Sequence, residues 1–404
     1  MKNILILDTG KEWGGGTNSL LELLRRIDRK EYRFTVLFYY NYEKPSKSDI
    51  RTEIEKLGID FLLLDRNNQS LTAKILKELG RAFLFFDRKL QRLWIFGIDY
   101  FFRIRKDVES ITKLLKDLGI ALLYMNNQPS TNLEGILAAK NTGVKSVLHS
   151  RIEADLSFFE INAVNKWLTK MICVSEGIKD SFVRQGINSS KCIVIHNGID
   201  TSITPAVSPE EIKQELGVGK DELLIGTVGS LVRRKRFNDL IKAISTLCVT
   251  RYALREGKIK CIIVGEGPER ESLQKEINKN RLNDRIILTG FKSDAISYIN
   301  AMDIFVLPSG REGFPRVILE AMLMGKPVVA SRIAGPAELI IDRETGFLFK
   351  TGNIEELADC ILRFLLSPQL RKDMGEAGRK RVIENFSIKR YVSEVSNILA
   401  EVVE

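Results

Sequence analysis

The sequence predicts an α/β protein built from two doubly wound parallel sheets in succession. Its 404 residues exceed one ordinary hydrophobic core, so length alone favours at least two domains. Short apolar runs alternate with amphipathic stretches through both halves, which is typical of parallel sheets with helices on both faces. A polar stretch with prolines at 205 and 209 separates the halves. We therefore expect domains at 1–200 and 201–385, followed by a terminal helical segment at 386–404.

The first half alternates strands and helices from its first residues onward. Its apolar runs predict buried strands at Ile4–Leu7, Phe34–Tyr39, Phe61–Leu64, Ala121–Met125, Lys145–Leu148, Met171–Ser175 and Cys192–His196. Helical spacing of apolar residues predicts helices at Asn18–Ile27, Ile50–Leu57, Lys106–Leu118 and Asn132–Thr142. This alternation predicts one parallel sheet with helices on both faces.

The loop after the first strand contains three consecutive glycines, Gly14, Gly15 and Gly16. Glycines before a helix let the backbone approach a ligand closely and leave amide groups free for anionic groups. Gly10 and Gly15 have the spacing of a P-loop, but Gly16 stands where the essential lysine would be, which excludes a P-loop. A flexible turn without a ligand is the structural alternative.

Two polar residues of the first half follow predicted strands. His149 comes directly after the strand Lys145–Leu148, at the carboxyl edge where open α/β sheets bind ligands. A lone histidine is also common as a structural residue, so both roles stay open for it. Asn197 begins the Asn-Gly turn that ends the first half, and a turn is the simplest interpretation of that dipeptide.

The second half repeats the alternation of strands and helices. Strands are expected at Glu222–Gly229, Lys260–Val264, Arg285–Leu288, Asp303–Pro308 and Pro327–Ala330. Helices are expected from about Asn238, from about Pro315 and over Phe386–Val402, where apolar residues recur at helical spacing.

A basic turn follows the strand that ends at Gly229. After Ser230 the chain carries four consecutive basic residues, among them Arg233, Arg234 and Lys235. Arginine pairs phosphate oxygens in a fork geometry and lysine supplies a point charge, so a turn of this kind can bind an anion. A solvated basic turn is the alternative interpretation.

Two glutamates, Glu312 in a loop and Glu320 in the helix that follows, are the strongest functional candidates. Helical side chains lean toward the N-terminus, so Glu320 can point back toward the loop, with Pro315 suited to the first helical turn. The amides of Gly313 and Phe314 lie near the positive end of that helix, where an oxygen-rich ligand can bind. Either glutamate alone is equally compatible with a solvated surface.

This segment resembles a known signature. Glu312-Gly-Phe-Pro, seven residues between the two glutamates, Ala321, and Gly325-Lys-Pro-Val-Val329 resemble the E-x7-E block of retaining glycosyltransferases of the GT-B fold, family 4. The resemblance covers the whole chain in outline and Leu223–Phe349 in detail. It implies two Rossmann-like domains facing across a cleft, with the last helix crossing back to the first domain.

The resemblance also implies roles for the candidate residues. Glu320 would hold the ribose hydroxyls and Glu312 the hexose hydroxyls of a nucleotide-sugar. Lys235 matches the lysine of the family's Gly-Arg-Leu-x-x-x-x-Lys pattern and would bind the diphosphate. Ser230 replaces the arginine of that pattern, which leaves open whether Arg233 or Arg234 supplies the second charge.

Further positions are assigned by the resemblance alone. His149 would face the donor sugar as a catalytic residue beside Glu312 and Lys235. The remaining donor-binding positions would be Gly229, Ser230, Gly265, Phe291, Gly313, Phe314 and Pro315. Gly14, Gly15, Gly16 and Asn197 would line the cleft beneath the donor phosphates and the acceptor.

The implied activity is transfer of a hexose or N-acetylhexosamine, with retained anomeric configuration, from a nucleotide-diphosphate sugar to a glycan or lipid-linked acceptor. The expected setting is bacterial-type synthesis of cell-surface polysaccharide or glycolipid. A UDP-sugar is favoured over a GDP-sugar. Fixed cations and helix-start amides can stabilise the leaving diphosphate, so we expect no metal and no other cofactor. Two histidines and the lack of a Cys/His cluster argue against a zinc site.

Composition favours a cytoplasmic protein. We expect no signal peptide, because the strand Ile4–Leu7 is too short for an h-region, and no run of eighteen uncharged apolar residues could span a membrane. Five cysteines without a CxxC pair fit free thiols in a reducing compartment. The net charge of +10 could serve nucleic-acid binding, but no recognition motif accompanies it, so we expect no nucleic-acid partner.

Residues 81–106 form a basic, aromatic insert. They contain eight aromatic residues out of 26, and seven basic residues against two acidic ones. The apolar residues recur at helical spacing, which predicts a helical pair packed on the first domain. The alternative is a surface that rests on an anionic membrane, with aromatic side chains in the headgroup layer, and it would imply a lipid-linked acceptor and a peripheral location on the inner membrane face.

Two other functions stay open. A nucleotide-sugar epimerase of the GT-B fold would share the donor site, although the E-x7-E block fits transferases better. A catalytically silent subunit that binds a nucleotide-sugar within a glycosylation complex is compatible with Ser230. An assay of donor hydrolysis and transfer by the isolated chain distinguishes these functions. A silent subunit shows neither reaction, and an epimerase yields an isomerised nucleotide-sugar.

Overall fold

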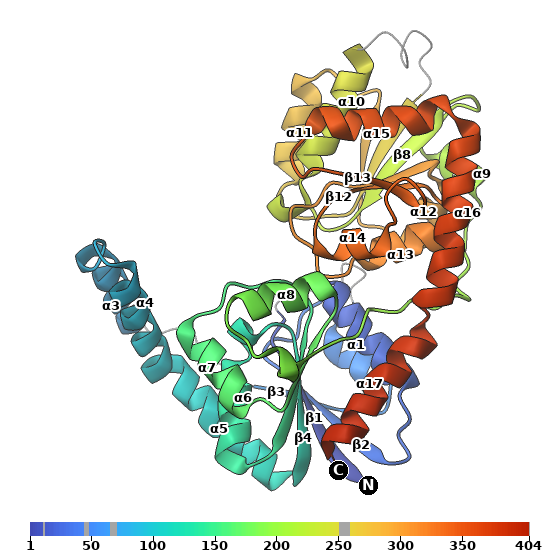
Figure 1. Ribbon diagram of the computed structural model, residues 1–404. Helices are drawn as coiled ribbons and strands as arrows, with labels where there is room; N and C mark the ends of the chain where they lie inside the picture. Colours follow the sequence, from blue (N-terminus) through green and yellow to red (C-terminus); the bar gives the residue numbers. More distant parts are fainter. Residues whose placement is uncertain (11–12, 44–47, 65–70, 250–258, 404) are drawn as a thin grey trace. The chain divides into compact units, whose positions relative to one another are not determined.

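The computed structural model describes residues 1–10, 13–43, 48–64, 71–249 and 259–403, which form two compact units (Figure 1). Unit 1 comprises Met1–Cys173, Lys179–Val194 and Glu394–Glu404. Unit 2 comprises Val174–Ile178 and Ile195–Ser393. Each unit holds one parallel sheet, and the prediction of two doubly wound α/β halves is confirmed.

The sheet of unit 1 has seven described strands in the order β3-β2-β1-β4-β5-β6-β7. Its strands are β1 (Lys2–Asp8), β2 (Tyr32–Phe38), β3 (Asp60–Leu63), β4 (Ile120–Asn126), β5 (Lys145–Ser150), β6 (Lys170–Cys173) and β7 (Cys192–Val194). The strand order reverses beside β1, whose neighbours are β2 and β4. Ligands of open α/β sheets bind at the carboxyl ends of strands at such a switch point.

Helices cover both faces of this sheet, as the βαβ connections require. The helices of this half of the chain are α1 (Gly15–Arg26), α2 (Ile50–Glu55), α3 (Leu71–Phe83), α4 (Arg88–Asp99), α5 (Arg105–Asp117), α6 (Leu133–Thr142), α7 (Phe158–Trp167) and α8 (Glu176–Arg184), of which α3 and α4 project instead of covering the sheet. Short helical turns are η1 (Tyr100–Ile104), η2 (Pro129–Thr131) and η3 (Ser189–Lys191). The last helix, α17 (Ile388–Val403), begins in unit 2, and its residues from Glu394 onward belong to unit 1.

The sheet of unit 2 has six described strands in the order β10-β9-β8-β11-β12-β13, with the switch point between β9 and β11 on either side of β8. Its strands are β8 (Leu223–Val228), β9 (Ile259–Val264), β10 (Ile286–Gly290), β11 (Ile304–Leu307), β12 (Val328–Ser331) and β13 (Gly346–Phe349). Its helices are α9 (Pro209–Glu215), η4 (Arg233–Lys235), α10 (Phe237–Val249), α11 (Arg270–Lys279), α12 (Ala295–Ala301), α13 (Arg316–Leu323), α14 (Ala334–Leu339), α15 (Ile354–Leu366) and α16 (Pro368–Asn385).

The strands of both sheets are apolar along their length because helices cover both faces. In β1 the side chains of Ile4, Leu5, Ile6 and Leu7 are buried, and β11 is buried throughout. In unit 2 a continuous core joins β8, β9 and β11 to α10, α11 and α15. These cores hold the loops at the carboxyl edges in place.

The insert at 81–106 is part of a helical hairpin that extends from unit 1 (Figure 1). We call α3, the turn after it and α4 the arm, residues 71–99. Helix α4 continues through the π-helical turn η1 into α5, and the backbone N–H of Arg105 bonds to the carbonyl of Tyr100 across that turn. Helix α3 packs against α4. The predicted helical pair is therefore present, but it projects from unit 1 instead of packing along it as expected.

Candidate functional site

Glu312 lies in the loop between β11 and α13, and its side chain is buried with 8% exposure. Its Oε1 atom lies 2.7 Å from Lys235 Nζ and 3.5 Å from Arg234 Nη1. Burial alone would raise the pKa of Glu312, but the charges of Lys235 and Arg234 outweigh it and hold the pKa below its usual range. Glu312 is therefore ionised at neutral pH and can accept hydrogen bonds from hydroxyl groups.

The Lys235 side chain is also buried, with 7% exposure, at the end of the short turn η4. Gly229 leaves room for it, because a Cβ atom at Gly229 would lie 3.3 Å from Lys235 Cε. Arg236, with φ of 52°, turns the backbone into α10, and its side chain pairs with Asp239 at 2.7 Å. The exposed side chain of Arg233 projects from the same turn. The structure thus joins the predicted basic turn to Glu312.

Glu320 lies in α13, on a helix that starts directly after the N-cap residue Pro315. Burial raises the pKa of Glu320, and Arg316 offsets only part of that effect. Within the described parts of the chain, the Glu320 carboxylate has no protein hydrogen bond or ion pair. Glu320 is only partly buried, so its carboxylate stays accessible, and a partly desolvated carboxylate without a protein partner is a candidate ligand contact.

The start of α13 packs tightly against neighbouring loops. Asn197 Nδ2 donates a hydrogen bond of 3.0 Å to the carbonyl of Phe314. Gly335 approaches Gly313 so closely that an added Cβ atom would collide with the Gly313 carbonyl. Asn197 therefore lies in unit 2 beside the predicted donor residues, whereas Gly14, Gly15 and Gly16 lie in unit 1.

The loops after the adjacent strands β8, β9 and β10 of unit 2 contain four predicted donor positions: Gly229, Ser230, Gly265 and Phe291. Gly229 donates its N–H to Val264 at 2.9 Å, and Gly265 donates its N–H to Gly290 at 2.9 Å. A Cβ atom at Gly265 would collide with the carbonyl of Gly229, and the φ of 146° at Gly265 also favours glycine. Phe291 directly follows Gly290, and Ser230 directly follows Gly229. The ends of β8, β9 and β10 are thus joined into one edge beside Lys235.

In unit 1 the three glycines form the start of α1. Gly14 is its N-cap residue, and the first turn of α1 contains no acidic residue to neutralise the positive helix end. An added Cβ atom would meet nothing within 4 Å at Gly14 or Gly15, whereas at Gly16 it would lie 3.4 Å from Arg151 Cγ. Gly14 and Gly15 are accordingly open, and Gly16 lies against Arg151. Residues 11–12 of this loop lie outside the described residues.

His149 is fully buried, and both of its ring nitrogens have partners. Tyr124 Oη lies 2.6 Å from Nδ1, and Arg151 Nη1 lies 3.2 Å from Nε2. Since a guanidinium can only donate, Nε2 accepts and Nδ1 carries the proton of a neutral imidazole. Burial and then Arg151 hold the pKa of His149 well below its usual range. His149 is therefore a neutral, firmly positioned side chain.

A second buried group in unit 1 is the carboxylate of Asp8, at the end of β1. It accepts hydrogen bonds from the N–H of Gly10 at 2.7 Å, Asn126 Nδ2 at 2.6 Å and Asn127 Nδ2 at 3.0 Å. Arg151 Nε donates to Asn126 Oδ1 at 2.8 Å, which links Asp8 to His149. Burial raises the pKa of Asp8 despite these bonds.

Four residues of this network were not predicted from the sequence as site residues: Tyr124, Asn126, Arg151 and Asp8. The signal that could have found three of them is position. Asp8 and Asn126 end the adjacent strands β1 and β4, and Arg151 follows β5, so all three lie at the carboxyl edge of the switch point. Tyr124 precedes that edge within β4 and carried no such signal.

Among the described residues, no group of three or more His, Cys, Asp or Glu side chains is arranged to hold a metal ion. Within the same residues, no helix combines the length and the apolar character that a membrane span needs.

Two family models match this chain. Glycosyl transferases group 1 matches residues 208–381, and Glycosyltransferase Family 4 matches residues 13–203. Together they cover most of both units. The first match contains Lys235, Glu312 and Glu320.

Several characterised proteins are similar in sequence. N-acetyl-alpha-D-glucosaminyl L-malate synthase of Bacillus anthracis is 29% identical over 209 residues, which cover 52% of this chain and 53% of that protein. Capsular polysaccharide biosynthesis glycosyltransferase CapM of Staphylococcus aureus is 27% identical, over 54% of this chain and 58% of that protein. UDP-Gal:alpha-D-GlcNAc-diphosphoundecaprenol alpha-1,3-galactosyltransferase of Escherichia coli is 26% identical, over 68% and 73%. The chain thus spans little more than half the length of the first two.

The fold agrees with this similarity. The structure of Anabaena Alr3699/HepE in complex with UDP-glucose superposes with a TM-score of 0.77 at 22% identity, covering 99% of this chain and 100% of that one. Sequence matches over both halves and a shared two-sheet architecture lead to one conclusion. The chain belongs to the group 1 glycosyl transferases and has the GT-B fold.

Proposed function

We propose that this protein is a retaining glycosyltransferase that moves a hexose or N-acetylhexosamine from a UDP-sugar to a glycan or lipid-linked acceptor. The observation that carries this proposal is the contact of Lys235 with Glu312, 2.7 Å apart, in the same unit as the partly buried Glu320, which has no protein partner among the described residues. A cation and two acidic groups are what the phosphates and hydroxyls of a nucleotide-sugar require.

The roles follow from the state of each group. Glu312, held ionised, accepts hydrogen bonds from hexose hydroxyls. Glu320 accepts hydrogen bonds from the two ribose hydroxyls, which gives its partly buried carboxylate the partners that it lacks among the described residues. Lys235 binds the diphosphate, and Arg234, whose Nη1 lies 3.5 Å from Glu312 Oε1, supplies the second charge.

The reaction breaks the bond between the anomeric carbon and the diphosphate oxygen, and both electrons stay with the diphosphate. The acceptor hydroxyl oxygen bonds the anomeric carbon from the same face, and its proton passes to the leaving phosphate oxygen. Lys235, Arg234 and the amides at the start of α13 stabilise the charge that develops on the diphosphate. Because these groups supply the stabilisation, we propose that transfer does not need a metal ion.

The comparisons support the substrate class. The relative in Escherichia coli acts on a diphosphoundecaprenol-linked sugar with UDP-galactose, and the Anabaena structure contains UDP-glucose. A lipid-linked acceptor would require the protein to work at the inner face of the membrane, as a cytoplasmic protein bound peripherally. Synthesis of cell-surface polysaccharide or glycolipid is the corresponding process.

The test is incubation of the purified protein with UDP-glucose, UDP-N-acetylglucosamine and GDP-mannose, with and without EDTA. We expect release of UDP from one UDP-sugar, unaffected by EDTA, and an α-anomeric product by NMR when an acceptor is present. Lys235→Ala should slow this release at least about tenfold, because a charge that stabilises the leaving group is lost. Lys242→Ala, an exposed lysine of α10, is the matched control.

Each alternative function or mechanism predicts a different result in this assay. An isomerised UDP-sugar would indicate an epimerase, and tight UDP-sugar binding without turnover would indicate a silent binding subunit. An inverted product would refute the retaining mechanism, and loss of activity in EDTA that Mg²⁺ restores would refute metal independence.

A further inference from the structure

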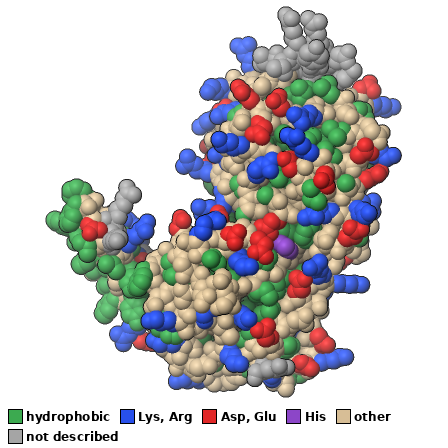
Figure 2. All heavy atoms as spheres, in the orientation of Figure 1, with side chains coloured by type: hydrophobic (Ala, Val, Ile, Leu, Met, Phe, Trp, Pro, Cys, Tyr) green, Lys and Arg blue, Asp and Glu red, His purple; other side chains and the backbone are tan. Residues whose placement is uncertain are grey.

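The arm exposes more large apolar side chains than a solvated helical hairpin needs. On α3, Leu71, Ile75, Leu79 and Phe83 are exposed at four-residue intervals, which places them on one helix face. At the tip, Phe83, Phe85 and Phe86 are 71%, 78% and 70% exposed. Figure 2 shows hydrophobic side chains gathered on this projection. Contiguous exposed apolar surface of this kind marks an interaction site.

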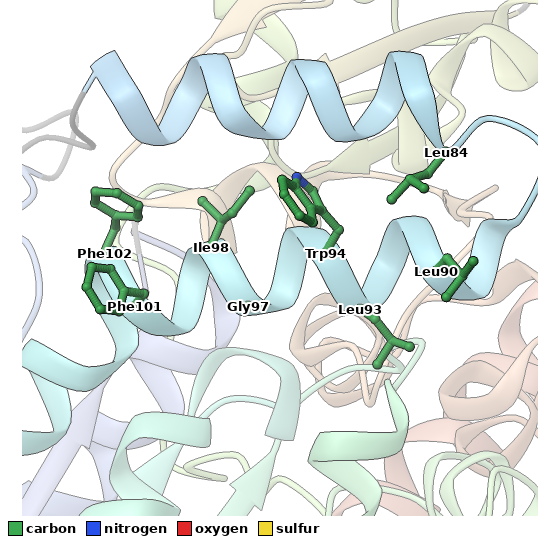
Figure 3. A pocket seen from close by; sticks show the side chains of 8 residues that line it. All are labelled: Leu84, Leu90, Leu93, Trp94, Gly97, Ile98, Phe101 and Phe102. Carbon is green, nitrogen blue, oxygen red and sulfur yellow. The ribbon is translucent and has the colours of Figure 1, made fainter.

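The second helix adds a hollow to this surface. An open hollow of about 560 Å³ is lined by apolar side chains, among them Leu90, Leu93, Trp94 and Phe101 (Figure 3). Gly97 lies in its floor, and an added Cβ atom there would meet nothing within 4 Å. The apolar surface continues to the base of the arm, where Phe96 stacks on Phe159 at 3.8 Å and Phe158 is exposed.

The same segment carries an excess of positive charge. Residues 71–106 contain nine Lys and Arg against three Asp and Glu. Two of the three acidic side chains pair within the arm, Glu78 with Arg81 and Asp99 with Lys77. Lys74 and Arg92 are exposed on the two helices. Arg88 and Lys89 lie near the tip, but their side chains are outside the described residues.

We propose that the arm binds an anionic lipid bilayer, with its phenylalanine tip in the acyl boundary and its basic residues among the headgroups. Trp and Phe favour the interfacial layer, and basic residues beside an apolar face attract anionic lipids. A second copy of this chain is a poorer occupant, because pairing two arms would bring like charges together. Side-by-side pairing of helices would also leave the tip phenylalanines in water.

This inference concerns the partner of the proposed transferase, but it depends only on the arm. The first experiment is flotation of the full chain, without donor or acceptor, with phosphatidylcholine vesicles and with vesicles that also contain phosphatidylglycerol. We expect binding to the anionic vesicles, weakened at high salt because the attraction is partly electrostatic.

Two variants test the phenylalanine tip and the basic residues of the arm separately. Replacing Phe83, Phe85 and Phe86 by serine should weaken vesicle binding at least about tenfold, since the inserted apolar area is lost. Lys74→Glu with Arg92→Glu should weaken it at least about tenfold through lost attraction. The matched controls are Leu366→Ser with Ile383→Ser, and Lys372→Glu with Arg379→Glu, which change exposed side chains of unit 2.

The depth to which the arm enters the bilayer is a third measurement. Trp94 fluorescence should be quenched by brominated lipid, and Trp94→Phe should remove that part of the quenching while the protein still binds. Vesicle binding that is equal in the tip variant and the wild type would overturn the proposal. So would a wild-type dimer that ignores vesicles and becomes monomeric in the tip variant, because the arm would then pair with a second copy.

The two proposals fail separately. A protein that releases UDP from a UDP-sugar but ignores anionic vesicles refutes the membrane inference alone. A protein that binds vesicles through the arm but turns over no nucleotide-sugar refutes the transferase proposal alone.

Discussion

Glu320 is a partly buried carboxylate that the free protein leaves without a hydrogen-bonded partner among its described residues. Its raised pKa means that the folded state binds the proton more tightly than the unfolded state does. Ionising Glu320 therefore lowers the stability of the folded protein as pH rises through its folded-state pKa.

Glu320→Gln should remove that cost. We expect the free protein to gain about 1 kcal/mol at neutral pH, while its affinity for UDP falls because the ribose hydroxyls lose a charged acceptor. Thermal unfolding with and without UDP measures both effects. A variant that loses stability in the free state would show that Glu320 is structural.

The Lys235–Glu312 pair has the opposite pH dependence. The folded-state pKa of Glu312 lies below its ordinary value of 4.5, so the ion pair stabilises the protein above that pH and ceases to do so as pH falls through the folded-state pKa. Removing the lysine leaves the buried carboxylate with the more distant Arg234.

Lys235→Met should therefore destabilise the protein by about 3 kcal/mol at neutral pH, with a smaller loss in acid. Denaturant unfolding of both proteins over pH 4 to 7, at about half-unit steps, measures the difference. A loss that is constant with pH would mean that Lys235 acts by packing alone. Lys242→Met serves as the exposed control.

The family resemblance assigned Lys235 and Glu312 to one donor site, in loops after the adjacent strands β8 and β11, but it did not predict that their side chains pair. The unit 1 network was harder to predict, since His149 meets Tyr124 and Arg151 only through side-chain orientation. Spacing along the chain does not show which side chains of different strands meet. The proposed role of His149 toward the donor sugar stays a prediction, and its full burial shows only that it is firmly held.

At the scale of elements, the arm depends on a close approach of its two helices. A Cβ atom at Gly80 would collide with the indole ring of Trp94, and Trp94 Nε1 donates a hydrogen bond of 2.9 Å to the carbonyl of Leu76. Helical periodicity over 81–106 predicted a helical pair, but not that its first helix begins at Leu71 or that Gly80 is the contact point. Glycine in a helix is an ambiguous signal from sequence alone.

Gly80→Leu should push the helices of the arm apart at a cost of about 1–3 kcal/mol to the local structure. We expect faster amide exchange over α3 and α4, and unchanged release of UDP from a UDP-sugar. Gly97→Leu is a matched control, because its added side chain starts in open space. Equal exchange in the two variants would contradict the close-packing argument.

At the scale of the whole molecule, both sheets have their switch point beside their first strand, β1 in unit 1 and β8 in unit 2. The alternation of strands and helices predicted two doubly wound parallel sheets but not their strand order, because the handedness of βαβ crossovers still allows several orders. The lengths of the edge strands were less predictable, since β7 has only three residues and little pattern.

UDP binding should affect unit 2, which contains the proposed donor residues Lys235, Glu312 and Glu320. UDP should slow amide exchange over 223–235 and 304–323, which contain β8, η4, β11 and α13, and leave the arm unchanged. Hydrogen exchange with mass spectrometry tests this. Protection spread over the arm would mean that the nucleotide binds elsewhere than proposed.

The π-helical turn η1 absorbs one residue without redirecting the arm. Such a turn accommodates one residue more than a regular α-helix within about the same rotation, so α4 and α5 stay in phase on either side of it. Deleting one residue from Tyr100–Ile104 should therefore restore a regular helix and leave the phenylalanine tip facing nearly the same way. We expect such a deletion to keep both the helical content seen by circular dichroism and the binding to anionic vesicles. Loss of vesicle binding with an intact helix would show that the bulged turn itself sets the direction of the projection.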